Sequence, residues 1–328
     1  MEGVNSMIRD CHIKADYLQK IIKENLDLNY NILQIMRIYG GARKVTYKVE
    51  CDQNFCYILY VWDNSMNYFN KDRNDNIIFE SNGSDLIELN NKFLIQNGIR
   101  TPKIYYIDRS KKDYLFDFAL VEYISGGEIE KYFGADEDTQ SKIFTDLDKN
   151  IKKLHSIKNK FYGNLKVQKS YDGRGEKLLL NKTLEDIQYS SKFHEGVFSN
   201  KIMLIQKIQE LYNNIKPRND YAFVHGELGP NHVFVDEHFN TYLIDIESAM
   251  FFDIEYEHSF LELRFGEFYK YLTVNNLDLD RLRFYKLHLH FSCLSGALQL
   301  KQKGYQDMED VNGMIEHNSK KVLSFIME

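Results

Sequence analysis

The first third of the chain consists of short apolar runs of strand length, and longer runs with helical spacing follow. The strand-like runs lie at residues 32–38, 45–49, 55–62, 103–107 and 116–124. Gly40-Gly41 and the Asp52-Gln53-Asn54 segment separate the first three, as turns do in an antiparallel meander. From Glu128 the spacing is mostly helical. We therefore expect an α+β fold in which a five-stranded antiparallel sheet precedes a mainly helical part.

Helical periodicity places an amphipathic helix at residues 7–22 and another at 86–96, which Gly98 and Pro102 end. Later helices are expected at residues 143–157, 202–215, 257–272, 279–303 and 311–327. With 328 residues, the chain is long enough for two lobes. We expect these lobes to be residues 1–123 and 124–328.

Composition excludes several classes of partner. The 42 lysines and arginines against 48 acids give a net charge of −6, which disfavours nucleic acid as a partner. No apolar window is long enough for a membrane span. The four cysteines lack the spacing of a metal site or a disulfide framework, which indicates reduced thiols and a cytoplasmic protein. Abundant Tyr, Lys, Asn and Ile suggest a bacterial origin.

One stretch combines residues that suit phosphoryl transfer. Strand-like runs at 221–224 and 233–235 flank His225-Gly226-Glu227, and a third run, 242–246, contains Asp245. In Mg²⁺-assisted phosphoryl transfer, one acid orients or deprotonates the acceptor hydroxyl while another holds the metal against the nucleotide phosphates. Asp245 lies near the end of this apolar run, where a buried acid needs a charged partner. These residues predict a magnesium-dependent phosphotransferase.

The same stretch resembles the catalytic and metal-binding loops of the aminoglycoside phosphotransferase and choline kinase families, which are relatives of protein kinases. In those families His-Gly-Asp is followed by four spacer residues, Asn, and later Ile-Asp-Phe or Ile-Glu. The resemblance implies a two-lobed protein-kinase-like fold, with Glu227 and His225 in the catalytic loop and Asp245 as a metal ligand. Two further acids of the family, which lie near the acceptor, fall on Asp253 and Glu257.

The chain departs from the family pattern at three positions. Glu227 replaces the catalytic Asp and is one methylene longer. By count, His232 occupies the place of the metal-binding Asn, while Asn231 lies one residue earlier. Mg²⁺ prefers oxygen ligands, so Asn231 is one candidate for the second ligand, and His232, acting itself or through a water, is the other. The third departure concerns the first lobe.

In the family, a lysine on the third strand contacts the nucleotide phosphates and pairs with a helix Glu. Tyr60 stands at that place here, and Glu88 is the candidate helix acid. Arg43 or Lys44 could supply the missing charge. The Gly40-Gly41 pair lies where the nucleotide-binding loop would be, although a plain hairpin turn explains it equally well. The resemblance assigns the nucleobase hinge to Glu122 and Tyr123.

These features predict transfer of the γ-phosphate of ATP or GTP to a hydroxyl of a small molecule, with Mg²⁺ as cofactor. The acids between Glu247 and Glu267 favour a cationic acceptor, such as an aminoglycoside or other antibiotic or an amino alcohol, and hence a role in antibiotic resistance. Several of them could instead form a solvated helix face. The changes at Tyr60, Glu227 and His232 keep an alternative open, in which an impaired kinase-fold protein binds a nucleotide or small molecule as a sensor or scaffold.

Overall fold

The computed structural model describes residues 11–25, 30–38, 43–63, 65, 82–166 and 174–327. The chain forms two compact units. Among the described residues, the first unit contains those up to 65 together with 82–129 and 233–247. The second contains residues 130–232 and 248–327. The sequence-based division into residues 1–123 and 124–328 did not include the segment 233–247 in the first unit.

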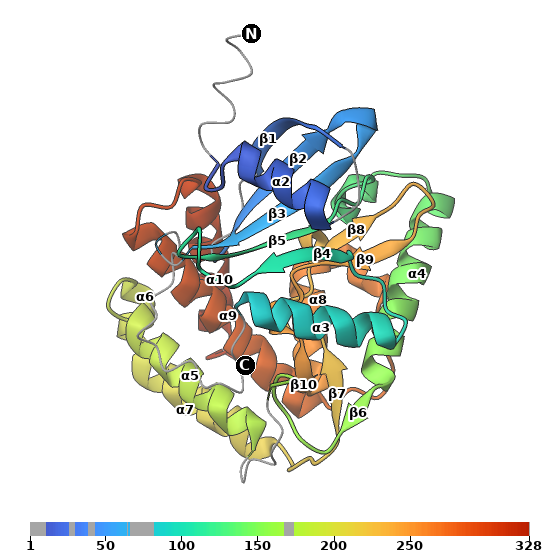
Figure 1. Cartoon of the computed structure of the whole chain (residues 1–328). Coiled ribbons are helices and arrows are strands. Elements are labelled where there is room, and N and C mark those ends of the chain that lie inside the picture. The colour runs from blue at the N-terminus through green and yellow to red at the C-terminus, as the bar shows by residue number, and fades with distance from the viewer. Residues whose placement is uncertain are drawn as a thin grey trace. The chain divides into compact units, whose positions relative to one another are not determined.

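The first unit is built on a five-stranded antiparallel sheet (Figure 1). Its strand order is β1-β2-β3-β5-β4. The strands are β1 (Ile32–Ile38), β2 (Val45–Cys51), β3 (Cys56–Trp62), β4 (Ile104–Asp108) and β5 (Asp117–Glu122). Each neighbouring pair is antiparallel. The sequence-based prediction of the sheet is therefore confirmed, with strand boundaries close to the apolar runs.

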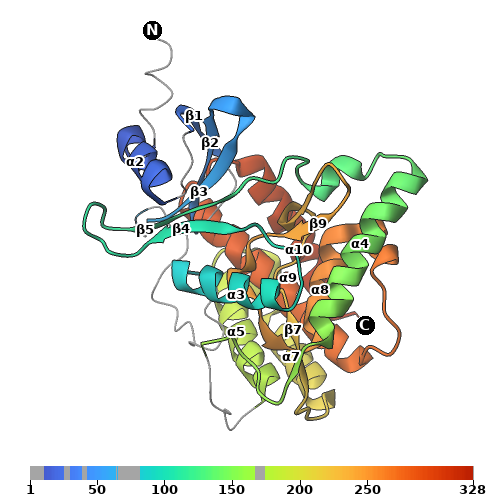
Figure 2. The ribbon, with the colours of Figure 1, turned by 45° about the vertical axis from the view of Figure 1, so that its right-hand side comes forward.

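Helix α2 (Ala15–Asn25) covers one face of this sheet (Figures 1 and 2). Its buried residues Leu18, Ile21 and Ile22 join a core with alternate residues of β2 and β3. The helix begins at Ala15, so the prediction that it extends back through residues 11–14 is wrong, and residues 7–10 lie outside the described part. Ile13 is fully buried without being helical, because it joins the same core.

Helix α3 (Ser84–Gln96) lies against the other face of the sheet (Figure 2). Successive strand residues point to opposite faces. Leu59 and Val61 of β3 therefore pack in the α2 core, whereas Tyr60 lines a pocket with Ile87 of α3. This alternation decides which side chains can reach the candidate site.

A small hairpin completes the first unit. It consists of β8 (Val233–Val235) and β9 (Thr241–Leu243). Its backbone is bonded to the unit at two points, where the Val235 N–H donates to the Gly127 carbonyl at 2.8 Å and the Leu243 N–H donates to the Arg100 carbonyl at 3.0 Å. These bonds place the residues that follow β9 in the sheet unit.

The second unit is mainly helical, as predicted. Its helices are α4 (Glu137–Ser156), α5 (Gly175–Ser190), α6 (Glu195–Ser199), α7 (Lys201–Asn214), α8 (Ile254–Phe265), α9 (Leu279–Gln302) and α10 (Met308–Ser324). A small sheet pairs β6 (Lys158–Asn159), β7 (Tyr221–Val224) and β10 (Met250–Phe252) in the order β10-β7-β6. The sequence patterns did not indicate α5 and α6, and α8 ends at Phe265 in a 3₁₀ segment, Gly266–Tyr271.

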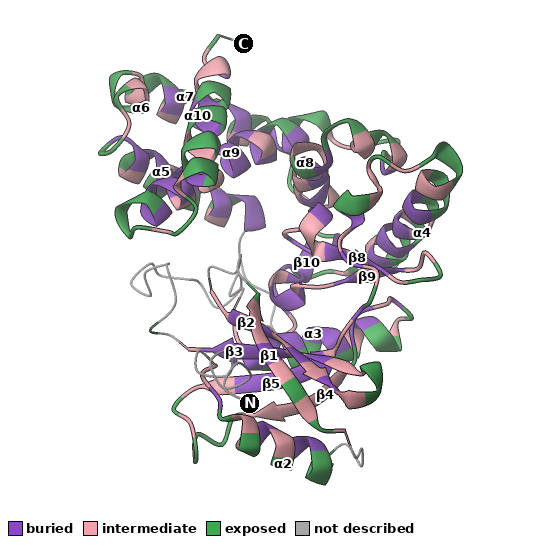
Figure 3. Cartoon of the chain, turned by 90° about the horizontal axis from the view of Figure 1, so that it is seen from above, coloured by how far each residue is buried: buried purple, intermediate pink, exposed green. Residues whose placement is uncertain are grey.

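Helix α9 is the central element of this unit. It packs against α5, α7, α8 and α10. Most of its residues from Arg281 to Leu300 are buried, so apolar and polar side chains on all sides of the helix meet neighbouring elements (Figure 3). Within the described residues, every helix is too short or too polar to span a bilayer.

Candidate functional site

Asp245 follows strand β9 in an unusual backbone conformation. Its φ angle is 57°, in the left-handed region that residues other than glycine rarely adopt. Asn90 of α3 holds the next turn of the chain by donating from its side-chain amide to the Ile246 carbonyl at 2.7 Å. Such conformations cost free energy and persist where the surroundings enforce them, which is common at functional sites.

Lys44, just before β2, forms ion pairs with Asp245 and Glu247. Its Nζ donates to Asp245 Oδ1 and, at 2.6 Å, to Glu247 Oε1. The Lys44 side chain is 11% exposed and that of Glu247 is 4% exposed. Burial alone would lower the pKa of Lys44, but the two carboxylates raise it above its ordinary value. Burial raises the pKa of Glu247, and Lys44 opposes this effect.

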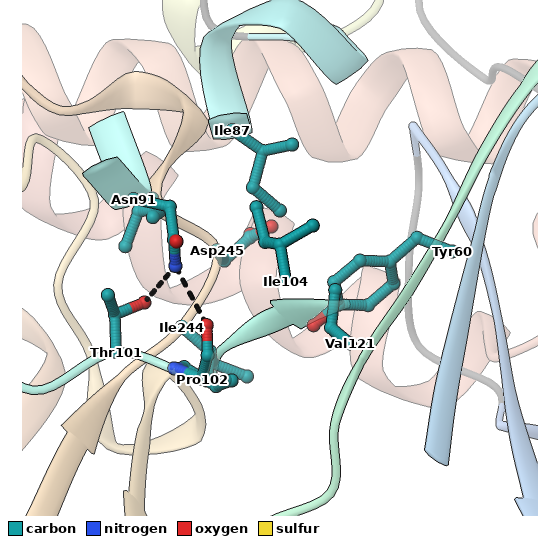
Figure 4. Close-up of a pocket in the computed structure, with 10 residues that line it drawn as sticks. Tyr60, Ile87, Asn91, Thr101, Pro102, Ile104, Val121, Ile244 and Asp245 are labelled. Carbon is teal, nitrogen blue, oxygen red and sulfur yellow. Dashed lines mark hydrogen bonds between the residues drawn. The ribbon is translucent and has the colours of Figure 1, made fainter. Parts of the chain in front are cut away.

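Tyr60 and Asp245 line one pocket of the sheet unit (Figure 4). The Tyr60 ring lies beneath the ammonium group of Lys44, with Nζ 4.9 Å from the ring centroid. Burial raises the pKa of Tyr60 to about 12, so its hydroxyl is neutral near pH 7. Across this pocket from Tyr60, the side-chain amide of Asn91 donates to the Pro102 carbonyl at 2.7 Å and so holds two of the lining residues together.

The other residues assigned to nucleotide binding have partners of their own. Glu88 is 52% exposed and pairs with Arg109 at 2.8 Å. The Glu122 carboxylate accepts the backbone N–H of Lys103 at 2.9 Å. The Tyr123 ring centroid lies 4.7 Å from Lys48 Nζ. Gly40 and Gly41 lie outside the described residues. The roles assigned to all five remain predictions.

In the helical unit, the loop that follows β7 is held by Glu257 from the first turn of α8. The Glu257 carboxylate accepts the backbone N–H groups of His225 at 2.5 Å and of Gly226 at 3.1 Å. Burial raises the pKa of Glu257 to about 7, although the backbone N–H groups act in the opposite direction. Glu257 therefore anchors the loop that contains the His-Gly-Glu sequence.

Gly226 cannot be replaced in this loop without rearrangement. Its φ is +88°, and a Cβ atom there would lie 2.7 Å from the Ser248 carbonyl oxygen. The close approach is supported by Ser248 Oγ, which donates to the His225 carbonyl at 3.1 Å. This packing buries both neighbours of Glu227 while Glu227 itself is partly exposed. The partly exposed carboxylate in this part of the loop is therefore that of Glu227.

His232 and Asn231 have different partners within the helical unit. His232 Nδ1 lies 2.7 Å from the Glu227 carbonyl oxygen, which can only accept, so Nδ1 donates this hydrogen bond. Asn231 Oδ1 instead accepts a hydrogen bond from Arg264 at 2.7 Å. The His232 ring is thus held by a backbone carbonyl, whereas the Asn231 oxygen already has a cationic partner, and the metal role of each remains a prediction.

Asp253 lies at the centre of a buried ion-pair cluster. Its Oδ1 is 3.2 Å from Arg218, and its Oδ2 accepts hydrogen bonds from Arg281 and Tyr285. Arg281 also pairs with Glu176 of α5 at 3.2 Å. Burial raises the pKa of Asp253, and the two arginines lower it. These contacts favour a structural role for Asp253 over contact with an acceptor.

The acids near Asp245 have suitable chemistry for a divalent cation. Asp245 and Glu247 supply carboxylate oxygens, which Mg²⁺ prefers. Glu247 Oε2 is buried and has no hydrogen-bond partner within the described part of the chain. No group of three or more His, Cys, Asp or Glu side chains in that part is arranged as a metal site. Asp245 and Glu247 are therefore a pair of candidate ligands rather than a complete set.

Solved structures with the same fold include two aminoglycoside-type phosphotransferases and LicA. A thermostable mutant of aminoglycoside phosphotransferase APH(4)-Ia aligns with a TM-score of 0.62 and 13% identity, over 92% of this chain and 98% of its own. Spectinomycin phosphotransferase APH(9)-Ia, with ADP and spectinomycin, gives 0.61 and 14%, over 97% and 98%. LicA in complex with AMP gives 0.59 and 14%, over 95% and 98%. At these identities the likeness establishes the fold, which is kinase-like as predicted.

The sequence comparisons agree with this fold. No curated protein sequence matches the chain significantly. The sequence profile of the phosphotransferase enzyme family matches residues 91–262, slightly more than half of the chain. The matched region runs from α3 through the His-Gly-Glu loop and Asp245 into α8. The chain therefore belongs to the phosphotransferase enzyme family.

Proposed function

We propose that this protein transfers the γ-phosphate of ATP or GTP to a hydroxyl group of a small molecule. The observation that carries the proposal is the strained Asp245, held beside Glu247 and paired with the buried Lys44. Family membership supports phosphoryl transfer. Proteins with the same fold bind nucleotides, among them an APH(4)-Ia mutant with AMP-PNP and hygromycin B.

Mg²⁺ fits the acids of the sheet unit. Asp245 and Glu247 would hold it, because their oxygens are hard ligands and Glu247 Oε2 is buried without a hydrogen-bond partner among the described residues. When bound, the ion would neutralise charge on the nucleotide phosphates. Asp245 needs no large rearrangement for this role, since Asn90 already fixes the backbone beside it.

The chemical step would proceed as an in-line displacement. The acceptor oxygen forms a bond to the γ-phosphorus while the bond from that phosphorus to the β–γ bridging oxygen breaks. Glu227 orients the acceptor hydroxyl and takes its proton, and the nucleoside diphosphate leaves with the electron pair of the broken bond. The anchored loop suits this role because Glu257 and the close packing of Gly226 fix the backbone immediately before Glu227.

For the acceptor, we propose a cationic amino alcohol or aminosugar. Hygromycin B and spectinomycin are bound by proteins of the same fold. In this chain the acids expected to attract a cation divide into two groups. Asp253 and Glu255 are buried and paired with Arg218, and Asp253 also with Arg281, whereas Glu227 and Glu267 are partly or fully exposed. The attraction therefore rests on fewer acids than the sequence suggests, and we expect only a modest rise of KM with salt.

The first experiment is a thermal melt of the parent with Mg²⁺ and ATP or GTP, followed by a nucleotide-turnover assay with a panel of aminoglycosides, other antibiotics, choline and neutral sugars. A ligand at about a hundredfold excess over its Kd stabilises the folded state by about 2.7 kcal/mol. Phosphorylated acceptor is the expected result. Nucleotide binding without turnover across the whole panel would favour the sensor or scaffold alternative.

Asp245→Asn tests the metal assignment. Asparagine tolerates the left-handed conformation, so this change removes charge with little effect on the backbone. We expect the Mg²⁺-dependent part of the stabilisation to disappear. Asp138→Asn, in the exposed first turn of α4, is the matched control. An Asp245→Asn variant that melts like the parent in Mg²⁺ and nucleotide would overturn the assignment.

A further inference from the structure

The strand lysine and helix glutamate of the family are not a pair in this chain. Tyr60 stands at the lysine position of β3, and Glu88 of α3 is largely exposed and pairs with Arg109. A phosphotransferase needs positive charge beside the phosphates, where negative charge accumulates during transfer. The sheet unit must therefore place a cation there by another route.

The register of the sheet identifies that route. Thr46 of β2 lies directly opposite Tyr60 of β3. Lys44 lies in the bend that leads into β2, two residues before Thr46, and its side chain extends over the ring of Tyr60. Its side chain crosses the Tyr60 ring, with Nζ 4.9 Å from the centroid, and reaches Asp245. A lysine just before the adjacent strand thus reaches Asp245, the acid that lines the same pocket as Tyr60.

Lys44 and its two acids form a buried group of charges rather than an ion pair on the surface. Lys44 and Glu247 are both buried, and a buried ammonium group is costly unless it is paired. One ammonium faces two carboxylates, and Glu247 Oε2 has no hydrogen-bond partner among the described residues. The group as a whole is therefore left with excess negative charge, which suits a divalent cation that arrives with a nucleotide.

We propose that Lys44 supplies the phosphate-binding cation from the beginning of β2, and that Glu247 is its positioning residue in place of Glu88. Asp245 is the partner of Lys44 while no phosphate is present. The ring of Tyr60 forms the apolar floor over which the lysine lies. The inference rests on the proposed function, since it names the residue that would contact the nucleotide phosphates in that reaction.

The test compares binding of the nucleotide with binding of its nucleoside, which has no phosphate. ATP or GTP with Mg²⁺, whichever the parent binds, and the matching nucleoside are titrated by calorimetry into the parent, Lys44→Met and Lys44→Gln. We expect both variants to bind the triphosphate at least tenfold more weakly and the nucleoside equally well. Turnover should fall by about 10²–10³, the usual effect of removing one charge-stabilising donor.

A second variant moves the charge back to β3. In the Lys44→Met background, Tyr60→Lys should recover at least tenfold of the lost triphosphate affinity, because its ammonium group starts beside the same acid. Recovery of triphosphate affinity with no change in nucleoside affinity would locate the effect at the phosphates rather than in the stability of the fold. Lys20→Met, in an exposed pair with Glu24 on α2, is the matched lysine control and should bind the triphosphate like the parent.

Lys44→Gln keeps hydrogen-bonding capacity toward Glu247 and provides a folded neutral variant if Lys44→Met unfolds. Triphosphate binding at parental strength in Lys44→Gln, or equal losses for triphosphate and nucleoside, would overturn the inference while the proposed function stands. A parent that binds neither ATP nor GTP would instead overturn the proposed function, and the inference with it. The parental titration separates these two failures.

Discussion

Glu257 bonds the backbone N–H groups of both His225 and Gly226, and so connects the first turn of α8 to the His-Gly-Glu loop. Its carboxyl group is fully buried, and burial raises its pKa from the ordinary 4.5 to about 7. A raised pKa in the folded state means that the stabilising contribution is complete below pH 4.5. That contribution is lost as the pH rises through 7, because the charged form is then buried.

Glu257→Gln should therefore become progressively more stable relative to the parent as the pH rises from 5 to 8. The glutamine oxygen can still accept the loop N–H groups, and the amide does not ionise in this range. Thermal melts at several pH values measure the difference in Tm, with Glu309→Gln in the first turn of α10 as a reference for the loss of one carboxylate. A difference that stays constant from pH 5 to 8 would contradict the assignment.

Asp253→Asn should lower the free energy of unfolding by about 3–5 kcal/mol, because Arg281 and Arg218 lose a buried anionic partner. If the role of Asp253 is structural, the acceptor KM should stay within about threefold of the parent at a temperature where the variant is folded. Chemical unfolding and steady-state kinetics measure the two effects. A tenfold rise in the acceptor KM would instead show that Asp253 contacts the acceptor.

Glu227→Gln should lower turnover by about 10²–10⁴, which is the usual contribution of a general base. Nucleotide-dependent stabilisation should be preserved, since Glu227 acts on the acceptor hydroxyl. The reverse comparison is Glu227→Asp, which restores the family residue but shortens its reach. Steady-state kinetics measure turnover, and thermal melts of the same preparations measure nucleotide-dependent stabilisation. Unchanged turnover in Glu227→Gln would assign proton transfer to another group.

The two candidates for the second metal ligand can be separated by paired substitutions. We expect His232→Ala to reduce Mg²⁺-dependent turnover more than Asn231→Ala, because the Asn231 oxygen is bonded to Arg264 whereas His232 is oriented through Nδ1. The measurement is turnover against Mg²⁺ concentration. A larger rise in the Mg²⁺ requirement of Asn231→Ala would reverse the assignment.

The sheet was predicted well from the sequence because each strand can be recognised from its own residues and the turn residues beside it. The apolar run at 32–38 coincides with β1, since a strand bounded by turn residues needs only its own side chains to be recognised. The opening helix was less accurate. Ile13 does not fit the helical spacing because it is buried in the sheet core before the helix begins.

The candidate site could be predicted only in part. Asp245 was recognisable as an acid at the end of an apolar run. The burial of Asp253 and Glu257 was not, because acids at helical spacing look the same whether they face solvent or distant arginines such as Arg281. Lys44 was one of two candidate cations, and only the register of β2 against β3 shows how it reaches Asp245.

The left-handed backbone at Asp245 has a consequence for how this protein can evolve. A glycine there would relieve the backbone strain, but it would also remove the carboxylate that pairs with the buried Lys44. These two effects act in opposite directions on stability. Turnover has no such balance, because the acid on which the proposed chemistry depends would be lost.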